Sequence, residues 1–273
     1  MFPKEIIFGL TMYDILLGVA VVAAIAIFTY FSNRRKLNYR LHNFILIDTV
    51  LAVILGYGFA VLFQALWNYL ETGAFVLSRN TGATFLGGLI GGAAVFFGVY
   101  FIAGAFVFKD GLNRRKLPGV LDVIAVCIPA AHSIGRLGCL CAGCCHGKPT
   151  DAWYGIYMVN LGKRVVPTQL FEALFLAALA AFLFVRALKN KKFNMPLYMA
   201  AYGIWRFPME LLRDDDRGHS FISFLTPSQL ISILLIAGSV VLFIVLKRAY
   251  AWADAKEKTD KPASGSAAGR ESE

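Results

Sequence analysis

The chain has 273 residues, of which 58% are hydrophobic and only 16% are charged, and its formal net charge is +10. A soluble domain usually has about 25% charged residues, so a soluble protein fits this composition poorly. The basic residues lie in short clusters between apolar runs rather than on one patch, which argues against a nucleic-acid partner despite the positive charge.

We interpret seven apolar runs as membrane-spanning helices, most of them near the length of about 20 residues that a hydrocarbon core of about 30 Å requires. We therefore predict an all-α, polytopic membrane protein with about seven transmembrane helices. The fourth run is short and is punctuated by Pro129 and Gly135, so we expect a broken or tilted helix there. The predicted spans are Tyr13–Phe31, Phe44–Leu66, Thr84–Phe108, Val120–Ile134, Thr168–Leu188, Met195–Leu212 and Pro227–Leu246.

The basic clusters also predict the topology. Only Lys4 precedes the first apolar run, and a cluster at 34–36 follows it, so we expect a permanent span rather than a cleaved signal peptide. Most other Lys and Arg residues lie in alternate loops and at the C-terminal end. The N-terminus is therefore predicted outside and the C-terminus in the cytoplasm. Residues 1–250 are expected to form a single transmembrane domain, and residues 251–273 a disordered cytoplasmic tail.

Small residues in the third predicted span indicate close packing. Gly87, Gly88, Gly91 and Gly92 lie on it at small-residue spacing. Such spacing lets a second helix or a lipid tail approach the backbone closely.

Ionisable residues in the spans suggest a functional site, because a charge within a bilayer is energetically costly. Arg136 and Arg206 are both predicted at the outer ends of their helices, and Glu210 shares a helix face with Arg206. Two converging guanidinium groups would suit the phosphate of a lipid headgroup. The alternative is an Arg–Glu ion pair that ties the fourth and sixth spans together. For Asp14 and Asp48 we expect pairing or an interfacial position.

Four of the five cysteines lie in one short segment on the predicted outer side. The segment contains Cys139, Cys141, Cys144 and Cys145, followed by His146. Thiolates and imidazole suit zinc or copper, although the spacing lacks the paired Cys-x-x-Cys of structural zinc sites. Disulfides and small-residue packing are the second interpretation. A catalytic thiol is the third, with Arg136 and His146 near enough in sequence to activate it.

Several motifs resemble those of the prolipoprotein diacylglyceryl transferase family. Gly135-Arg136-Leu137-Gly138, followed by Gly143 and Gly147, resembles the family signature. Other pieces fall in the family's order, and the resemblance covers roughly residues 10–246. These pieces are Tyr13, Phe85–Gly91, Asp122, Pro167–Glu172 and Tyr202–Phe207 with Glu210 and Arg213.

The resemblance implies an enzyme that moves a diacylglyceryl group from phosphatidylglycerol to the lipobox cysteine of a prolipoprotein signal peptide. It implies a bacterial cytoplasmic membrane, an active site toward the outer face, and no cofactor. Arg136 would bind the headgroup and Arg206 would hold the leaving phosphate. The implied catalytic residues are Arg136, Arg206, Glu210 and Tyr13. The implied substrate-binding residues are Arg136, Gly87, Gly88, Asp122, Gly147, Gln169, Glu172 and Arg213.

The sequence departs from the family where protons would be handled. Leu86 and Val166 stand where the family has histidines, and Cys139 and Cys144 replace an asparagine and a glutamate. His132 or His146 could substitute for the lost histidines. The rival hypotheses are a divergent paralogue with another acceptor, a non-catalytic lipid- or metal-binding membrane protein, and a transporter. Transporters often show a repeat between halves, which this sequence lacks.

Overall fold

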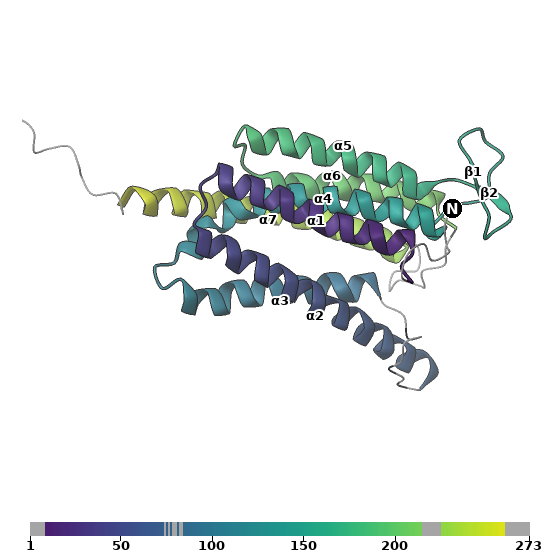
Figure 1. Cartoon of the computed structure of the whole chain (residues 1–273), viewed down its shortest axis with the longest axis horizontal. Coiled ribbons are helices and arrows are strands. Elements are labelled where there is room, and N and C mark those ends of the chain that lie inside the picture. The colour runs from purple at the N-terminus through teal and green to yellow at the C-terminus, as the bar shows by residue number, and fades with distance from the viewer. Residues whose placement is uncertain are drawn as a thin grey trace, which may run out of the picture. The chain divides into compact units, whose positions relative to one another are not determined.

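Most of the residues that the structure describes are helical. The computed structural model describes residues 9–73, 75, 77, 81, 84–214 and 225–259. Within these residues there are seven α-helices, one 3₁₀ turn and one hairpin, so the predicted all-α fold is confirmed (Figure 1). The elements are α1 (Met12–Arg34), α2 (Tyr39–Thr72), α3 (Phe85–Val107), α4 (Leu112–Ala142), β1 (Ile156–Met158), β2 (Lys163–Val165), α5 (Thr168–Leu188), α6 (Asn194–Met209), η1 (Glu210–Leu212) and α7 (Pro227–Thr259).

Six of these helices are long and apolar enough to cross a membrane, namely α1, α2, α3, α4, α5 and α7. Helix α6 has 16 residues, fewer than the roughly 20 that a full span needs. The 3₁₀ turn η1 continues it as far as Leu212. The prediction of a polytopic membrane protein with about seven helices is therefore confirmed, while the sides on which the termini lie stay a prediction.

Helix α4 corrects one expectation. It is a single helix of 31 residues that contains both Pro118 and Pro129, so the predicted short, broken span is wrong. A proline removes one backbone N–H, but membrane helices tolerate it where neighbouring groups satisfy the freed carbonyls. The continuous helix also passes Gly135 and carries Arg136 on regular backbone rather than in a loop.

Helix α7 also differs from its prediction. It continues to Thr259, so residues 251–259, which were assigned to a disordered tail, are helical. The Lys192 ammonium lies 3.1 Å from Oδ2 of Asp254 and 4.4 Å from the centre of the Tyr250 ring. These contacts tie the C-terminal turns to the connection between α5 and α6. The rest of the predicted tail lies outside the described residues.

The chain divides into two compact units, one formed by residues 1–31 and 118–273 and the other by residues 32–117. The second unit contains α2 and α3. A Cβ on Gly87 or Gly91 would collide with Phe63 or Phe59 of α2, so the backbone of α3 lies directly against α2. This confirms the close helix packing predicted from the small-residue spacing.

The buried polar groups of the second unit include one reciprocal pair and one carboxylate without a hydrogen bond among the described residues. The Tyr100 hydroxyl donates to the Asn113 carbonyl at 2.8 Å, and the Asn113 amide donates to the Tyr100 carbonyl at 3.0 Å. Asp48 is only 1% exposed, and its carboxylate oxygens have no hydrogen-bond partner among the described residues. The pairing expected for Asp48 is therefore wrong. Asp14, in the first unit, caps α1 by accepting hydrogen bonds from Thr11 N and Oγ1 at 2.9 and 2.6 Å.

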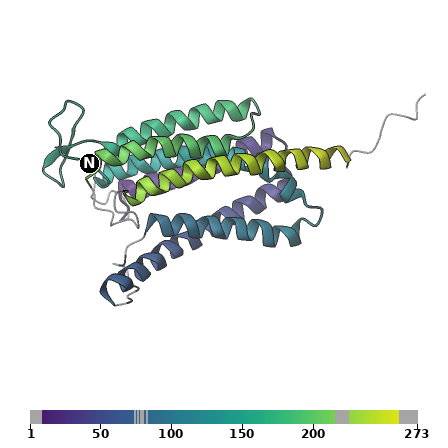
Figure 2. The same cartoon turned by 180° about the vertical axis from the view of Figure 1, so that it is seen from behind.

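The first unit contains α1, α4, α5, α6 and α7, which run side by side in both views (Figures 1 and 2). Phe175 of α5 stacks on Trp205 of α6 with ring centres 4.4 Å apart, and Phe31 of α1 meets Phe184 of α5 at 5.0 Å. The antiparallel hairpin β1–β2, in which Ile156 is paired with Val165, extends beyond one end of these helices (Figure 1).

A buried carboxylate fastens the opposite end of this unit. Asp122 of α4 accepts a hydrogen bond at 2.6 Å from the backbone N–H of Asn194, the first residue of α6. It accepts a second from the Tyr250 hydroxyl of α7. A carboxylate at a helix N-terminus satisfies a free backbone donor and the positive end of the helix dipole. Asp122 thus joins three helices.

Candidate functional site

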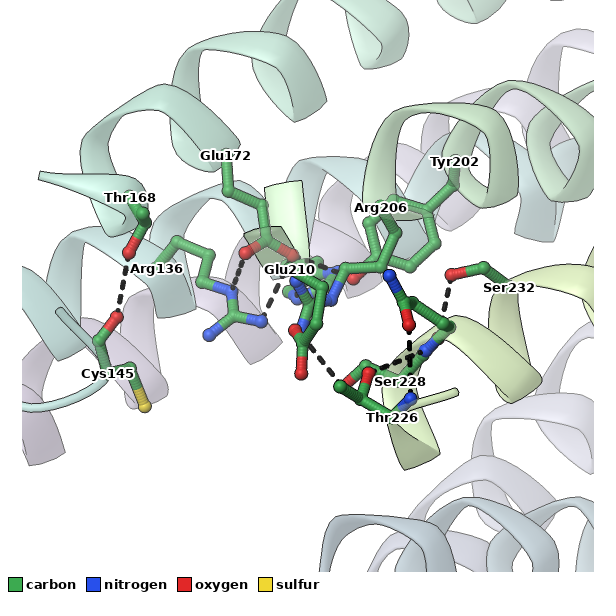
Figure 3. A network of polar contacts seen from close by, with 12 residues as sticks. Arg136, Cys145, Thr168, Glu172, Tyr202, Arg206, Glu210, Thr226, Ser228 and Ser232 are labelled. Atoms are coloured by element: carbon green, nitrogen blue, oxygen red, sulfur yellow. Dashed lines mark hydrogen bonds and ion pairs between the residues drawn. The ribbon is translucent and has the colours of Figure 1, made fainter. Parts of the chain in front are cut away.

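The candidate site lies at the end of the first unit from which the hairpin extends. Arg136 comes from the last turns of α4, Glu172 from the first turns of α5, and Arg206 from the last turn of α6. Because the chain direction of α5 is opposite to that of α4 and α6, these three positions fall at one end of the bundle. Figure 3 shows their side chains pointing toward one another.

Glu172 is the centre of the site. Its side chain is 1% exposed, and its carboxylate faces the Arg136 guanidinium, with Nε 3.0 Å from Oε2 and Nη2 3.0 Å from Oε1. The Tyr202 hydroxyl of α6 donates to Oε1 at 2.7 Å, and His132 Nε2 lies 4.0 Å from the same oxygen. A buried carboxylate is tolerated only with such charged and hydrogen-bonding partners. The Nη2 contact is a hydrogen bond, whereas Nε lies at ion-pair distance from the carboxylate without hydrogen-bond geometry among the described residues.

Arg206 has its own set of partners. It is buried, and its Nη2 donates to Oε2 of Glu210 at 2.5 Å and to Oγ of Ser228 at 3.0 Å. The predicted face shared by Arg206 and Glu210 is confirmed. The Arg206 Nη1 is also buried, and it has no hydrogen-bond partner in the part of the chain that is described. One donor group of this guanidinium therefore remains for a further acceptor.

The start of α7 holds Ser228 in place. Thr226 N donates to Oε1 of Gln229 at 3.0 Å, and Gln229 N donates to Oγ1 of Thr226 at 3.2 Å. This reciprocal arrangement is a capping box, which fixes the first turn of a helix. Since Ser228 lies between these two residues, the cap also fixes its hydroxyl against Arg206.

The two guanidinium groups lie near the same carboxylate. Arg136 contacts Glu172 directly, whereas Arg206 lies one turn after Tyr202, whose hydroxyl donates to that carboxylate (Figure 3). Glu172 and Glu210 together balance these two positive charges. An arrangement of two oriented guanidinium groups, one with an unused donor, is suited to binding the oxygens of a phosphate. The predicted convergence of the arginines is thus present, and both Arg–Glu ion pairs exist as well. The ion pair of Arg136 joins α4 to α5, not to α6.

The loop after α4 is held against the first turn of α5. The Gln169 amide donates to the Cys144 carbonyl at 2.5 Å. The Thr168 hydroxyl donates to the Cys145 carbonyl at 3.0 Å, a contact drawn in Figure 3. Gly147 pairs through its backbone with Arg213, and its N–H donates to Val166 O at 2.8 Å. A Cβ on Gly147 would meet the Leu212 carbonyl at 2.6 Å, so only glycine fits between these two strands of backbone.

The cysteine segment forms a cluster of three thiols. The sulfur atoms of Cys139, Cys144 and Cys145 all lie within 4.8 Å of one another. All five cysteines are among the described residues and all are free, so the predicted disulfides are not formed. Hydrogen bonds from the thiols of Cys139 and Cys144 lower the pKa of Cys145, and the charges of Arg213 and Arg136 add to this effect.

The other predicted site residues have structural contacts of their own. Tyr13 of α1 packs on Gly138 of α4, beside the three clustered cysteines. Asp122 is fourteen residues from Arg136, which is about 21 Å along α4, and it fastens the other end of the unit. It does not join the site around Glu172, contrary to the prediction. Gly87 and Gly88 belong to the unit that contains α2 and α3, where they pack against α2.

Two residues of the network were not assigned to the site from the sequence. Tyr202 lies four residues before Arg206, so a helical face shared with Arg206 could have revealed it. Ser228 follows the Thr226-Pro227 start of α7, but its contact with Arg206 depends on how α6 and α7 pack. No pattern within the sequence reports that packing.

Comparison with known proteins points in one direction. A family model described as prolipoprotein diacylglyceryl transferase matches residues 4–245. The chain is 32% identical over 253 residues to the phosphatidylglycerol–prolipoprotein diacylglyceryl transferase 2 of Clostridium perfringens, covering 88% of this chain and 93% of that protein. It is 28% identical to a similarly named protein of Clostridium tetani, covering 87% and 94%. A relative from Finegoldia magna is 34% identical, covering 76% and 78%.

The contacts of Glu172 predict how the protein responds to losing this carboxylate. The change Glu172→Gln leaves the Arg136 guanidinium buried without the negative charge of its partner, and breaking a buried pair costs about 3–5 kcal/mol. We expect a clear drop in the unfolding temperature of the detergent-solubilised protein. The matched control is Asp254→Asn, whose carboxylate also meets a cation at 3.1 Å but is 60% exposed. An equal drop for both variants would contradict the central role of Glu172.

Proposed function

Because the chain belongs to the prolipoprotein diacylglyceryl transferase family, we propose that it transfers a diacylglyceryl group from phosphatidylglycerol to the thiol of a prolipoprotein. The match covers nearly all of the helical region, and the chain spans most of the length of the relatives named above. The protein is thus a membrane-embedded transferase of lipoprotein biosynthesis. The acceptor in this proposal is the lipobox cysteine of the signal peptide.

The observation that carries the proposed site is the convergence of Arg136 and Arg206 beside one buried carboxylate. Arg136 is oriented by Glu172 and Arg206 by Glu210, so neither guanidinium must reorganise to receive a phosphate. The buried Nη1 of Arg206, which has no hydrogen-bond partner among residues 9–73, 84–214 and 225–259, supplies a donor for a phosphate oxygen. We assign both arginines to the phosphate of the headgroup, which Arg136 binds in the intact lipid and Arg206 also holds as it departs.

The chemistry is a displacement at a glyceryl carbon. The sulfur of the acceptor cysteine attacks this carbon, a C–S bond forms, and the bond between the carbon and the phosphate oxygen breaks. Glycerol phosphate leaves with the bonding electron pair, so negative charge grows on the leaving oxygen. Fixed positive groups that face this developing charge stabilise the transition state more than the ground state. This electrostatic stabilisation is usually the largest contribution to the rate enhancement. In this scheme Arg206 performs that task.

The thiol proton needs an acceptor, and Leu86 stands where the family has a histidine. We assign this role to His132. Its Nε2 lies 4.0 Å from Glu172, and its ring meets Tyr202 edge-on with centres 5.4 Å apart, so it belongs to the same network as Arg136. His146 differs, because its Nδ1 lies 3.0 Å from the neighbouring Gly147 carbonyl oxygen, outside that network.

We infer the side of the membrane on which the site lies from the topology predicted by the sequence. Lys and Arg gather in the loops that the positive-inside rule assigns to the cytoplasm. The site around Glu172 lies at the other end of the helices, so we place it toward the outer face of the bacterial cytoplasmic membrane. A lipid headgroup and the cysteine of a signal peptide both reach this depth.

The first test concerns the two arginines. Purified protein is given phosphatidylglycerol and a lipobox peptide, and the thioether product is measured by mass. We expect Arg136→Ala and Arg206→Lys each to lower the transfer rate about 100-fold or more, as loss of one well-placed donor to a developing anion does.

The control for this test is Arg186→Ala. Arg186 is also a helical arginine, but it contacts Asn194 at the opposite end of the unit, and this variant should retain the wild-type rate. Transfer at the wild-type rate by Arg136→Ala or Arg206→Lys, in protein that inserts normally into the membrane, would refute the assigned roles.

The second test concerns the proton acceptor. We expect His132→Asn to slow transfer by about 100-fold or more, because general base catalysis contributes a factor of that order. The same change at His146 should have little effect. Part of the lost rate should return as the pH rises, since the acceptor thiol then ionises without help. If His132→Asn kept both the transfer rate and the pH profile of the wild type, His132 would not be the group that accepts the thiol proton.

A further inference from the structure

Three of the four clustered cysteines are brought together in a way that the sequence does not reveal. The sulfur atoms of Cys139, Cys144 and Cys145 lie within 4.8 Å of one another, whereas Cys141 and His146 are not part of the group. One thiol comes from the last turns of α4 and two from the loop that follows it. Of the four cysteines and one histidine in this segment, the fold therefore brings together three thiols and no imidazole.

The spacing of the sulfur atoms fits a single bound ion. A metal–sulfur bond is about 2.3 Å long, so three sulfurs arranged in a triangle around one ion lie about 4 Å apart. The three thiols need to move by less than about 1 Å each to reach this arrangement.

The loop that carries two of the thiols is held rigidly. Three successive carbonyls each accept a hydrogen bond from a side chain elsewhere in the unit. The contacts are Asn160 Nδ2 to Gly143 O at 3.0 Å, Gln169 Nε2 to Cys144 O at 2.5 Å and Thr168 Oγ1 to Cys145 O at 3.0 Å. This fixation lowers the entropy lost when the thiols bind a ligand.

The backbone at Cys145 adds a second observation. Its φ is +61°, a left-handed conformation that costs a non-glycine residue about 1–3 kcal/mol. Such strain persists only where the surrounding structure determines the conformation, and it is typical of ligand-binding and active sites. Gly143, two residues earlier, also has a positive φ of 73°, so the loop turns sharply between α4 and Cys145.

We propose that Cys139, Cys144 and Cys145 form a three-thiolate site for one soft metal ion of the copper(I) type. Binding forms three metal–sulfur bonds and releases the thiol protons to the solvent. Soft thiolates suit both copper(I) and zinc, but copper(I) accepts three ligands whereas structural zinc sites use four, so the number of sulfur atoms favours copper(I).

This site adjoins the transferase site without being part of it. The loop is hydrogen bonded to Thr168 and Gln169 of the first turn of α5, and Glu172 lies one turn further along the same helix. A bound ion would therefore fix the connection between α4 and α5 beside the Arg136–Glu172 pair. Metal binding is measured directly, so its test does not depend on the transferase activity.

The first experiment measures binding. The full chain in detergent is reduced, kept without oxygen and titrated with copper(I) in competition with a coloured copper(I) chelator. We expect one ion per chain, and at least about 10-fold weaker binding after serine replaces Cys139, Cys144 or Cys145. Cys141→Ser is the matched control and should bind as the wild type does. Absence of stoichiometric copper(I), dependence on Cys141, or stronger binding of zinc(II) than of copper(I) would overturn the proposal.

The second experiment uses the unchanged chain, so it does not depend on the folding of a variant. Thiols are alkylated with and without copper(I), and the modified residues are identified by mass. We expect copper(I) to protect Cys139, Cys144 and Cys145 while Cys141 reacts at an unchanged rate. Equal alkylation of all four with and without the metal, or a disulfide formed within the cluster in place of metal uptake, would refute the site.

Discussion

The buried carboxylate of Glu172 is the constraint on which the rest of the site depends. An ionised carboxylate taken out of water loses several kcal/mol of solvation unless charged and hydrogen-bonding groups replace the water. Here the guanidinium of Arg136 and the hydroxyl of Tyr202 supply that replacement at 3.0 and 2.7 Å. Because these groups come from α4 and α6, the carboxylate on α5 holds the ends of three helices at a fixed distance.

This arrangement prepares the arginines for an anion. Arg136 uses Nε and Nη2 for Glu172, and Arg206 uses Nη2 for Glu210 and Ser228. Each contact sets the plane of a guanidinium and leaves its Nη1 outside the ion pair. A phosphate that binds to donors fixed in this way meets groups that are already oriented, and their orientation is maintained by packing and by the capping box of α7.

Parts of this account follow from the sequence, for reasons that are local. The length and hydropathy of the apolar runs predict the helices, and the bounds of α5 were predicted to the residue. The contact of Arg206 with Glu210 follows from the spacing of four residues. The resemblance to the family placed Arg136, Glu172 and Arg206 among the functional residues, and the structure brings these three to one end of a unit.

The rest could not be predicted because it depends on how distant segments pack. Arg136 and Glu172 are 36 residues apart, and their pairing requires the register between α4 and α5. The continuity of α4 through Pro129 depends on tertiary surroundings that override the local preference of proline. Which three of the four neighbouring cysteines lie together depends on the conformation of the loop, which side chains hold through its carbonyls.

The central claim is that Arg136 and Arg206 hold one phosphate between them, and a double-mutant cycle on lipid binding tests it most directly. Phosphatidylglycerol binding is measured for the wild type, for Arg136→Gln, for Arg206→Gln and for the double variant. If both groups bind the same phosphate, the two losses are not additive, with a coupling free energy of about 1 kcal/mol or more. Losses that add within about 0.5 kcal/mol would show that the arginines act on separate groups and would contradict the account.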